Sequence, residues 1–328
     1  MAGPRFRLRA LVLAFAFLLL SYPFQATLIP QFYIDCVVAL GRKDLIPGPP
    51  RPSLVTPLTP APPPASYGPW IPEASGFLYG KFVKKADEQH NTYSVYLVTN
   101  RHVIEEHDEF AKGGPLWVRF NSTSAGSARE YDIPLRDAQG KPVWHFHPNA
   151  SVDIAVILIN PEFLKSQGAR FAYFRADDEL LTRAKAKELG LSEGDGVYVL
   201  GFPMGLTAGR QKDYVIVRQG SIARVRDVLD SPEPGTFLID SFIFPGNSGG
   251  PVVLRPEVVS VGGQPINKAY LLGVVKSYLP YTDYAISPQT KRVRVSFEEN
   301  AGLAEVIPSE YIEEAIADYE KQVSIPAH

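Results

Sequence analysis

Residues 246–251 have the sequence GNSGGP, followed by the apolar pair Val252 and Val253. A nucleophilic serine needs an exposed hydroxyl on a sharp turn, with backbone N–H groups directed at the position where negative charge develops. The glycines around Ser248 permit such a turn and let a substrate carbonyl approach closely. We therefore interpret Ser248 as a nucleophile. The alternative is a plain glycine-rich turn between two strands.

Two motifs earlier in the chain contain the partners that a serine nucleophile needs. Residues 97–104 read LVTNRHVI, with His102 at the end of an apolar strand, where its ring can face a cleft and still be held. Residues 151–157 read SVDIAVI, with Asp153 in an apolar run, where a carboxylate is costly unless it is paired. A carboxylate that accepts from a histidine Nδ1–H orients the ring and stabilises its charged form. Each motif alone would also suit a structural role, as a strand-end histidine or a turn aspartate.

The pattern of strands around these motifs predicts an all-β protein. Short segments rich in aromatic and β-branched residues follow one another from residue 76 onward, separated by Gly, Pro, Asn and Asp. Only residues 177–189 and 309–322 have a helical pattern. Many short strands with so few helices favour an antiparallel barrel or sandwich over alternating strand–helix units. The first expected strands are 76–83, 93–100, 115–120 and 152–159.

The order of the three motifs along the chain is the chymotrypsin order of His, Asp and Ser. With its segments TNRHVI, DIAVI and GNSGGPVV, the chain resembles the trypsin-like serine proteases of the bacterial HtrA/Deg type. The resemblance implies two six-stranded antiparallel β-barrels over residues 31–323, with a short C-terminal helix. It implies that Ser248 is the nucleophile, His102 the general base and acid, and Asp153 the orienting carboxylate. The implied oxyanion hole consists of the backbone N–H groups of Gly246 and Ser248.

The resemblance also implies an activity. It implies a serine endopeptidase that hydrolyses proteins or peptides through an acyl-enzyme intermediate. Two alternatives remain: a protease-fold module that binds extended peptides with little turnover, and an acyl hydrolase that uses the same residues on other substrates. The PDZ domains that HtrA proteases carry after the catalytic unit are not expected, since the residues after Pro251 are needed for the last strands and helix.

The residues that line the first substrate pocket are expected from the segment before the serine turn and from the strand at 274–278. This strand would take the substrate backbone as an added strand. No acidic residue stands at the expected base of the pocket, so a preference for Lys or Arg is not predicted. Either Lys276 or Ser277 is expected beside Asp153. The candidates for substrate binding are Phe242, Phe244, Val275, Lys276, Ser277 and Tyr278.

Neither a cofactor nor a metal ion is expected. His145 and His147 alternate along one strand, but no third ligand is evident nearby. His107 follows two glutamates and is expected to face solvent. The single cysteine, Cys36, excludes an intrachain disulfide and a Cys-based zinc site, and it is expected to be buried in a strand at 31–41.

Charge and proline content narrow the remaining possibilities. Lys and Arg total 33 against 35 Asp and Glu, a net charge of −2, so nucleic-acid binding is not predicted. Of the 30 prolines, eleven lie within residues 47–72. Proline lacks the N–H donor and fixes φ, so we expect an extended insertion loop at 46–74. The alternative for this segment is a docking ligand for an aromatic groove. The sequence does not predict the oligomeric state.

Residues 1–26 have the features of a secretory signal peptide. Three arginines within the first nine residues precede the apolar run ALVLAFAFLLL at 10–20. Cleavage is expected after Ala26, and the alternative is an uncleaved membrane anchor at 10–29. Either form would place the rest of the chain in the periplasm or outside the cell, with the anchor as its membrane contact.

Overall fold

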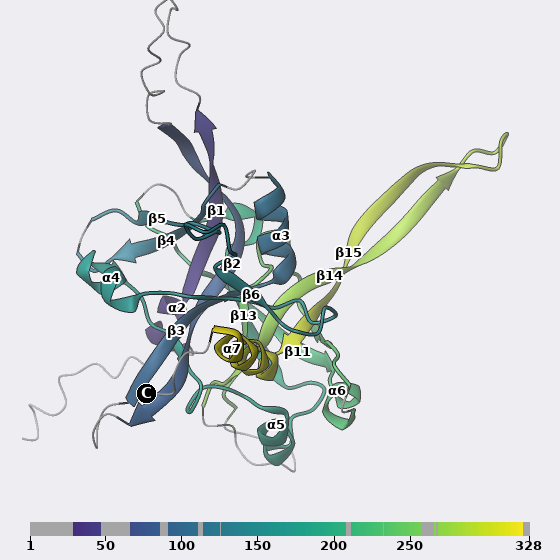
Figure 1. Ribbon diagram of the computed structural model, residues 1–328. Helices are drawn as coiled ribbons and strands as arrows, with labels where there is room; N and C mark the ends of the chain where they lie inside the picture. The colour runs from purple at the N-terminus through teal and green to yellow at the C-terminus, as the bar shows by residue number, and fades with distance from the viewer. Residues whose placement is uncertain are drawn as a thin grey trace, which may run out of the picture. The chain divides into compact units, whose positions relative to one another are not determined.

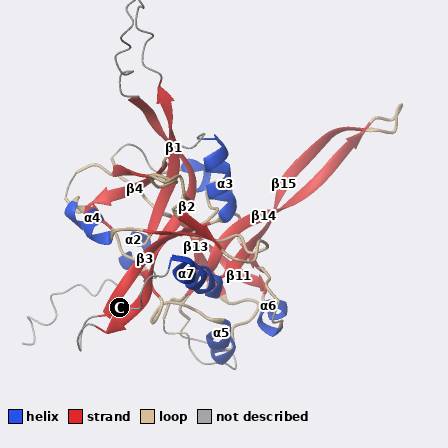
Figure 2. Ribbon diagram, in the orientation of Figure 1, coloured by secondary structure: helices blue, strands red, loops and turns tan. Residues whose placement is uncertain are grey.

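The computed structural model consists mainly of antiparallel strands (Figures 1 and 2). The chain divides into a unit of residues 1–30 and a unit of residues 31–328, and the account below concerns the second. No described helix is long and apolar enough to cross a membrane. The signal or anchor segment and the proline-rich residues 47–65 lie outside the described part of the chain. The structure describes residues 29–46, 66–85, 91–110, 114–124, 126–207, 211–231, 233–257, 266 and 268–323.

The first half of the chain forms a nine-stranded sheet. Seven strands follow the order β5-β4-β1-β2-β3-β7-β6, while β8 pairs with β4 and β9 pairs with β2. One face packs on a core that includes Leu40, Leu78 and Ile104, each fully buried. The strands are β1 (Val37–Ile46), β2 (Ser66–Lys85), β3 (Asn91–Thr99), β4 (Leu116–Ser122), β5 (Arg129–Ile133), β6 (Trp144–Phe146), β7 (Ala155–Leu158), β8 (Ala169–Arg170) and β9 (Phe174–Arg175).

The second half forms a closed barrel of six antiparallel strands in the order β10-β11-β12-β15-β14-β13. Its interior is filled by side chains that alternate along the strands, among them Val197 and Val199 of β10. The strands are β10 (Gly196–Gly201), β11 (Ile216–Arg224), β12 (Phe237–Asp240), β13 (Pro251–Leu254), β14 (Leu271–Ile286) and β15 (Val293–Pro308). The predicted all-β class is confirmed. Of the two six-stranded barrels expected, the second is a closed barrel, and the first is a nine-stranded sheet instead.

The helices are short, and several were not predicted. The C-terminal helix expected at 309–322 is confirmed as α7. The helix expected at 177–189 is shorter, because it begins only where Thr182 accepts a hydrogen bond from the backbone N–H of Lys185. The helices are α2 (Gln31–Asp35), α3 (Arg101–Phe110), α4 (Pro161–Ser166), α5 (Arg183–Leu189), α6 (Arg226–Asp230) and α7 (Glu310–Val323), with a 3-10 turn, η1 (Pro203–Gly205).

Two expectations about the start of the chain need correction. The strand expected at 31–41 begins with the helix α2, so Cys36 precedes β1; its side chain is fully buried, as predicted. The loop expected at 46–74 is shorter, because residues 66–74 belong to β2 and pair with β1 as far as Ile46. Here β2 pairs with β1 alone among the described strands, and a strand paired on one side tolerates prolines that lack a donor.

Helix α7 follows the barrel but packs against the N-terminal sheet. His145 Nε2 lies 2.8 Å from Asp318 Oδ2, and His147 Nε2 lies 3.2 Å from Glu314 Oε2. The two histidines considered as a metal pair are therefore held by carboxylates of α7. No group of three or more potential metal ligands occurs among the described residues. Helix α7 thus fastens the two halves of this unit together.

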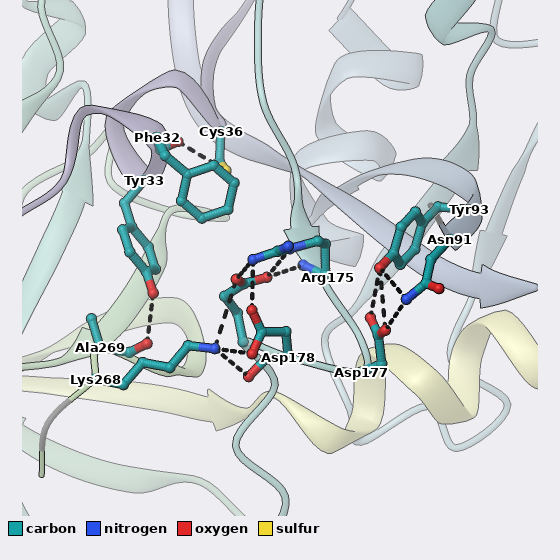
Figure 3. Close-up of polar contacts among 11 residues, drawn as sticks. Phe32, Tyr33, Cys36, Asn91, Tyr93, Arg175, Asp177, Asp178, Lys268 and Ala269 are labelled. Carbon is teal, nitrogen blue, oxygen red and sulfur yellow. Dashed lines mark hydrogen bonds and ion pairs between the residues drawn. The ribbon is translucent and has the colours of Figure 1, made fainter. Parts of the chain in front are cut away.

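A second set of polar contacts joins the halves near the connection between them (Figure 3). Arg175 donates to Glu179 through its backbone N–H at 2.7 Å and its Nε at 3.0 Å. Lys268 donates to Asp178, and the Tyr33 hydroxyl donates to the backbone carbonyl of Ala269 at 2.7 Å. The Glu179 side chain is only 2% exposed, so its charge depends on these partners. Helix α2, the connection after β9 and the segment before β14 are held together here.

Candidate active site

His102 and Asp153 lie side by side at the ends of two paired strands. β3 ends at Thr99, opposite Ala155 at the start of β7, so His102 in the first turn of α3 faces the segment before β7. His102 Nδ1 lies 2.6 Å from Asp153 Oδ2, and the backbone N–H of His102 donates to Oδ1 at 2.9 Å. Asn100 Nδ2 donates to the Asp153 carbonyl at 2.9 Å. One carboxylate oxygen therefore holds the His102 ring and the other holds the His102 backbone.

This pairing controls the protonation of His102. Burial alone would lower the pKa of the imidazole, because a charged ring loses hydration. The hydrogen bond and the negative charge of Asp153, helped by Glu106, outweigh burial and raise the pKa of His102 above its ordinary value, while Lys276 opposes the rise. The raised pKa makes the ring a stronger base. Its second nitrogen, Nε2, has no partner among the described residues.

Ser248 lies on a turn that only glycine allows. Gly246 has φ = +96°, and a Cβ added there would lie 2.5 Å from the Phe202 carbonyl oxygen. Asn247 closes the turn: its backbone N–H donates to the Phe244 carbonyl, and its Oδ1 accepts from the Phe244 N–H, both at 3.0 Å. The N–H groups of Gly246 and Ser248 donate to no acceptor within the described part of the chain. The two N–H groups that the resemblance implies as the oxyanion hole therefore have no competing acceptor there.

Ser75 supports this turn from the N-terminal sheet. Its side chain is fully buried, its Oγ donates to the Gly246 carbonyl at 2.7 Å, and it accepts from the Phe202 N–H at 2.9 Å. Its backbone N–H donates to the Ser248 carbonyl at 3.0 Å. The Gly246 carbonyl is thereby held toward Ser75. Ser75 belongs to the glycine-rich segment that precedes the histidine motif, but nothing in the sequence pattern indicated this contact.

The Ser248 hydroxyl bonds to a backbone carbonyl and not to the His102 ring. Its Oγ donates to the Lys276 carbonyl at 3.3 Å, and it makes no bond to His102 in the described structure. Ser248, His102 and Asp153 nevertheless line one cleft of about 880 Å³ between the sheet and the barrel. The hydroxyl and the ring therefore face a common space.

Four of the six expected substrate residues line this cleft: Phe244, Lys276, Ser277 and Tyr278. Val275 does not, because side chains alternate along β14 and Val275 points into the barrel core, where it is fully buried. Phe242 is 52% exposed and lies outside the cleft, near Gly302. The cleft is further bounded by Ile243 and Pro245.

Neither Lys276 nor Ser277 contacts Asp153 among the described residues. Both contact Glu305 on β15 instead, with Lys276 Nζ and Ser277 Oγ each 3.1 Å from Glu305 Oε2. Burial would raise the pKa of Glu305, but these two partners outweigh it and hold that pKa below its ordinary value. Asp153 is held instead by His102 and, through its backbone carbonyl, by Asn100.

The prediction that His107 faces solvent is wrong. Its ring is 3% exposed, because the i, i+3 spacing from Ile104 places both side chains on the buried face of α3. His107 Nδ1 lies 3.3 Å from Glu73 Oε2, and its Nε2 lies 3.1 Å from the Pro115 carbonyl. Burial would raise the pKa of Glu73, but His107 and Arg42 outweigh it and lower that pKa. These residues form a polar wall of the cleft that the sequence did not reveal.

Comparison with known proteins adds three findings. A family model described as a trypsin-like peptidase domain matches residues 74–261, a range that contains His102, Asp153 and Ser248. Among solved structures, the HtrA-type protease AlgW with decapeptide is similar at 18% sequence identity and a TM-score of 0.42. That match covers 88% of this chain and 66% of the AlgW chain. A comparison with curated protein sequences gave no match.

Proposed function

This chain belongs to the trypsin-like peptidase domain family, whose model matches more than half of its length, and we propose that it is a serine endopeptidase. Ser248 is the nucleophile, His102 the general base and acid, and Asp153 the orienting carboxylate. The observation that carries this proposal is the 2.6 Å contact between His102 Nδ1 and Asp153 Oδ2. In this contact Nδ1–H donates to the carboxylate, which leaves Nε2 unprotonated and able to act as the base.

The proposed reaction begins when the Ser248 hydroxyl leaves the Lys276 carbonyl and donates to His102 Nε2. Catalytic hydrogen bonds of this kind commonly tighten only with substrate present. Oγ then bonds to the peptide carbonyl carbon as its proton moves to Nε2, and the N–H groups of Gly246 and Ser248 stabilise the oxyanion. The C–N bond breaks, and the imidazolium gives its proton to the leaving amine. Water, deprotonated by His102, hydrolyses the acyl-enzyme and restores the serine.

An unpaired edge of β14 supports an extended peptide as the substrate. β13 pairs with β14 only as far as Val274, so residues 276–280 have β15 as their one partner strand among the described elements. A peptide added along this edge would pass Ser248 with its carbonyls near the serine turn. Phe244 and Tyr278 border this part of the cleft and favour apolar over charged side chains there.

The second candidate is a peptide-binding module with the protease fold. The bond from Ser248 Oγ to the Lys276 carbonyl favours it, because a serine held there is not activated by His102. Such a module would use the same edge of β14 without turnover.

A fluorophosphonate probe distinguishes the two candidates, because it reacts only with an activated serine. We expect the wild-type chain to be labelled and Ser248→Ala to be unlabelled, with the exposed Ser296→Ala as a labelled control. Absence of labelling in folded wild type would contradict the peptidase and favour the binding module. Cleavage of a peptide library would then separate an endopeptidase from a hydrolase of other acyl substrates.

We also propose that the chain is exported and cleaved after Ala26. The support is the arginine-then-apolar pattern of residues 1–26, which lie outside the described structure. Amino-terminal sequencing of the mature protein tests the cleavage site, and Thr27 is expected as the first residue. A membrane-bound protein that retains residues 10–29 would instead establish the anchor.

A further inference from the structure

The longest paired strands of the barrel continue past it as a free hairpin. β14 and β15 remain paired from Pro280 opposite Asn300 to Ile286 opposite Val293, with one register shift between Ala285 and Ile286. Over this stretch each strand pairs only with the other among the described elements. Figure 1 shows this pair of strands running out from the barrel. We call residues 280–300 the hairpin arm.

The hairpin arm exposes apolar side chains along both strands. One face of the arm carries four apolar and two acidic side chains, because directly opposed residues share a face: Tyr281, Ala285, Val295 and Phe297, with Asp283 and Glu299 between them. Tyr281 is 58% exposed and Phe297 54%. An isolated two-stranded ribbon is marginally stable in water, and a contiguous exposed apolar surface commonly marks an interaction site. This face of the arm thus has the composition of an interface.

Charge is divided along the length of the hairpin arm. The cations lie near the turn, and the acids lie closer to the barrel. About four residues separate the two groups along a strand, or roughly 13 Å at the usual strand rise. None of these charges takes part in an ion pair within the described part of the chain. The cations are Lys291, Arg292 and Arg294, and the acids are Asp283 and Glu299 on the face that carries Phe297 and Glu298 on the other face.

We propose that two copies of this chain associate through their hairpin arms, with the faces that carry Phe297 in contact and the arms in opposite directions. A two-fold axis near Ala285 and Val295 sets the basic end of each arm against the acidic part of the other. Both ends of the interface are then attractive, and Phe297 is buried between the arms. A two-fold interface is necessarily self-complementary, and the division of charge along the arm meets this requirement. The proposal does not depend on the peptidase chemistry.

The same features argue against a lipid surface as the partner. The turn carries the polar residues Gln289 and Thr290 at the end that would enter a membrane first. Glu298 and Glu299 would also be repelled by an anionic membrane on which the arm lay flat. A second copy of this chain accounts for both the apolar face and the two charged regions.

Sedimentation equilibrium of the full chain tests the proposal directly. The wild type is expected to form dimers that weaken as salt concentration rises, because the charged contacts are exposed. Phe297→Asp is expected to raise the dimer Kd about tenfold or more, since it places a charge in the apolar contact. Phe163→Asp, at another exposed phenylalanine outside the arm, is the matched control and is expected to leave the Kd unchanged.

Charge reversal tests the opposed arrangement. Reversing the cations (Arg292→Glu with Arg294→Glu) or the acids (Asp283→Lys with Glu299→Lys) creates like charges at both ends of a homodimer and is expected to abolish it. Mixing the two variants restores attraction at both ends, so a mixed dimer is expected with near wild-type Kd. Because all four side chains are on the exposed arm, the unfolding temperature is expected to stay near the wild-type value.

Three outcomes would overturn the proposal. One is a wild-type chain that stays monomeric at every concentration. Another is a dimer whose Kd is unaffected by Phe297→Asp, which would place the interface elsewhere. The third is a monomer that binds phosphatidylcholine–phosphatidylglycerol vesicles through the arm and loses this binding in Phe297→Asp, which would make a membrane the partner. Failure of the two reversed variants to form a mixed dimer would overturn the opposed arrangement itself.

Discussion

Ser75 acts on the serine turn from outside the group of residues that would perform the chemistry. Its hydroxyl is the donor that holds the Gly246 carbonyl, and its oxygen is the acceptor for the Phe202 N–H. The Gly246 carbonyl belongs to the peptide between Gly246 and Asn247, so holding it fixes the backbone between the Gly246 and Ser248 N–H groups. Under the proposed function, Ser75 is therefore a positioning residue for oxyanion binding.

We predict that Ser75→Ala lowers kcat about 10- to 100-fold with little change in KM, because oxyanion stabilisation is lost while the substrate edge stays intact. Steady-state kinetics measure both parameters, and the rate of fluorophosphonate labelling should fall in parallel. The exposed Ser296→Ala serves as the control. A folded Ser75→Ala protein with wild-type kcat would refute this role.

Asp153 sets the pH range in which His102 works. Because Asp153 raises the pKa of His102, the general base becomes protonated at a higher pH than an ordinary histidine. We predict that kcat/KM of the wild type falls as pH drops through a value above the usual histidine pKa of about 6.5.

Asp153→Asn should lower kcat by about 10⁴ and shift this acidic limb to lower pH, since the charge and the hydrogen bond that raise the His102 pKa are both altered. The pH profile of residual kcat/KM measures the shift, with the exposed Asp283→Asn as the control. A wild-type limb at or below 6.5 would argue against the effect of Asp153 on His102.

At the scale of elements, the junction drawn in Figure 3 joins α2, the connection after β9 and the start of β14. Its partners are unequal: the Glu179 side chain is 2% exposed and that of Arg175 is 40% exposed. Removing Arg175 leaves a carboxylate in the interior, with Lys268 Nζ still 3.9 Å away. Removing the Glu179 charge leaves the Arg175 guanidinium, which can reorient toward solvent. The two deletions should therefore differ in cost.

We predict that Arg175→Gln lowers the free energy of unfolding by about 3 kcal/mol and Glu179→Gln by only about 1 kcal/mol. Urea unfolding measures both, and Arg224→Gln, whose pair with Asp227 is exposed on both sides, should cost less than about 1 kcal/mol. Burial already raises the pKa of Glu179, so the deficit of Arg175→Gln should shrink as pH falls through that raised pKa and the carboxyl becomes neutral. Equal losses in the two variants would contradict this asymmetry.

For the molecule as a whole, the sequence predicted those features that depend on residues close together in the chain. The glycines around Ser248, the apolar strand before His102 and the amphipathic pattern of α7 each indicated their structures, because turn geometry and periodicity depend on neighbouring residues. The sequence also indicated the all-β class. The contact between His102 and Asp153 followed from the family resemblance and not from the residues alone.

What could not be predicted depends on residues far apart in sequence. Ser75 bonds to the turn at Gly246, and the carboxylates that hold His145 and His147 come from α7. No local pattern encodes such partners. The exposure of the hairpin arm is likewise not visible in the sequence. Its alternating apolar residues are typical of a half-buried strand, yet no described strand pairs with its outer edges and its side chains are exposed.

The closure of the barrel determines which parts of the candidate site can form first during synthesis. β12 pairs with β15, so the barrel around Ser248 cannot close until Val293–Pro308 has been synthesised. A chain that is synthesised and exported amino end first would present His102 and Asp153 well before the serine turn is braced. Under the proposed function, a chain that has not yet reached β15 would carry a base without a competent nucleophile, and it would be unable to cleave itself until that strand has been made.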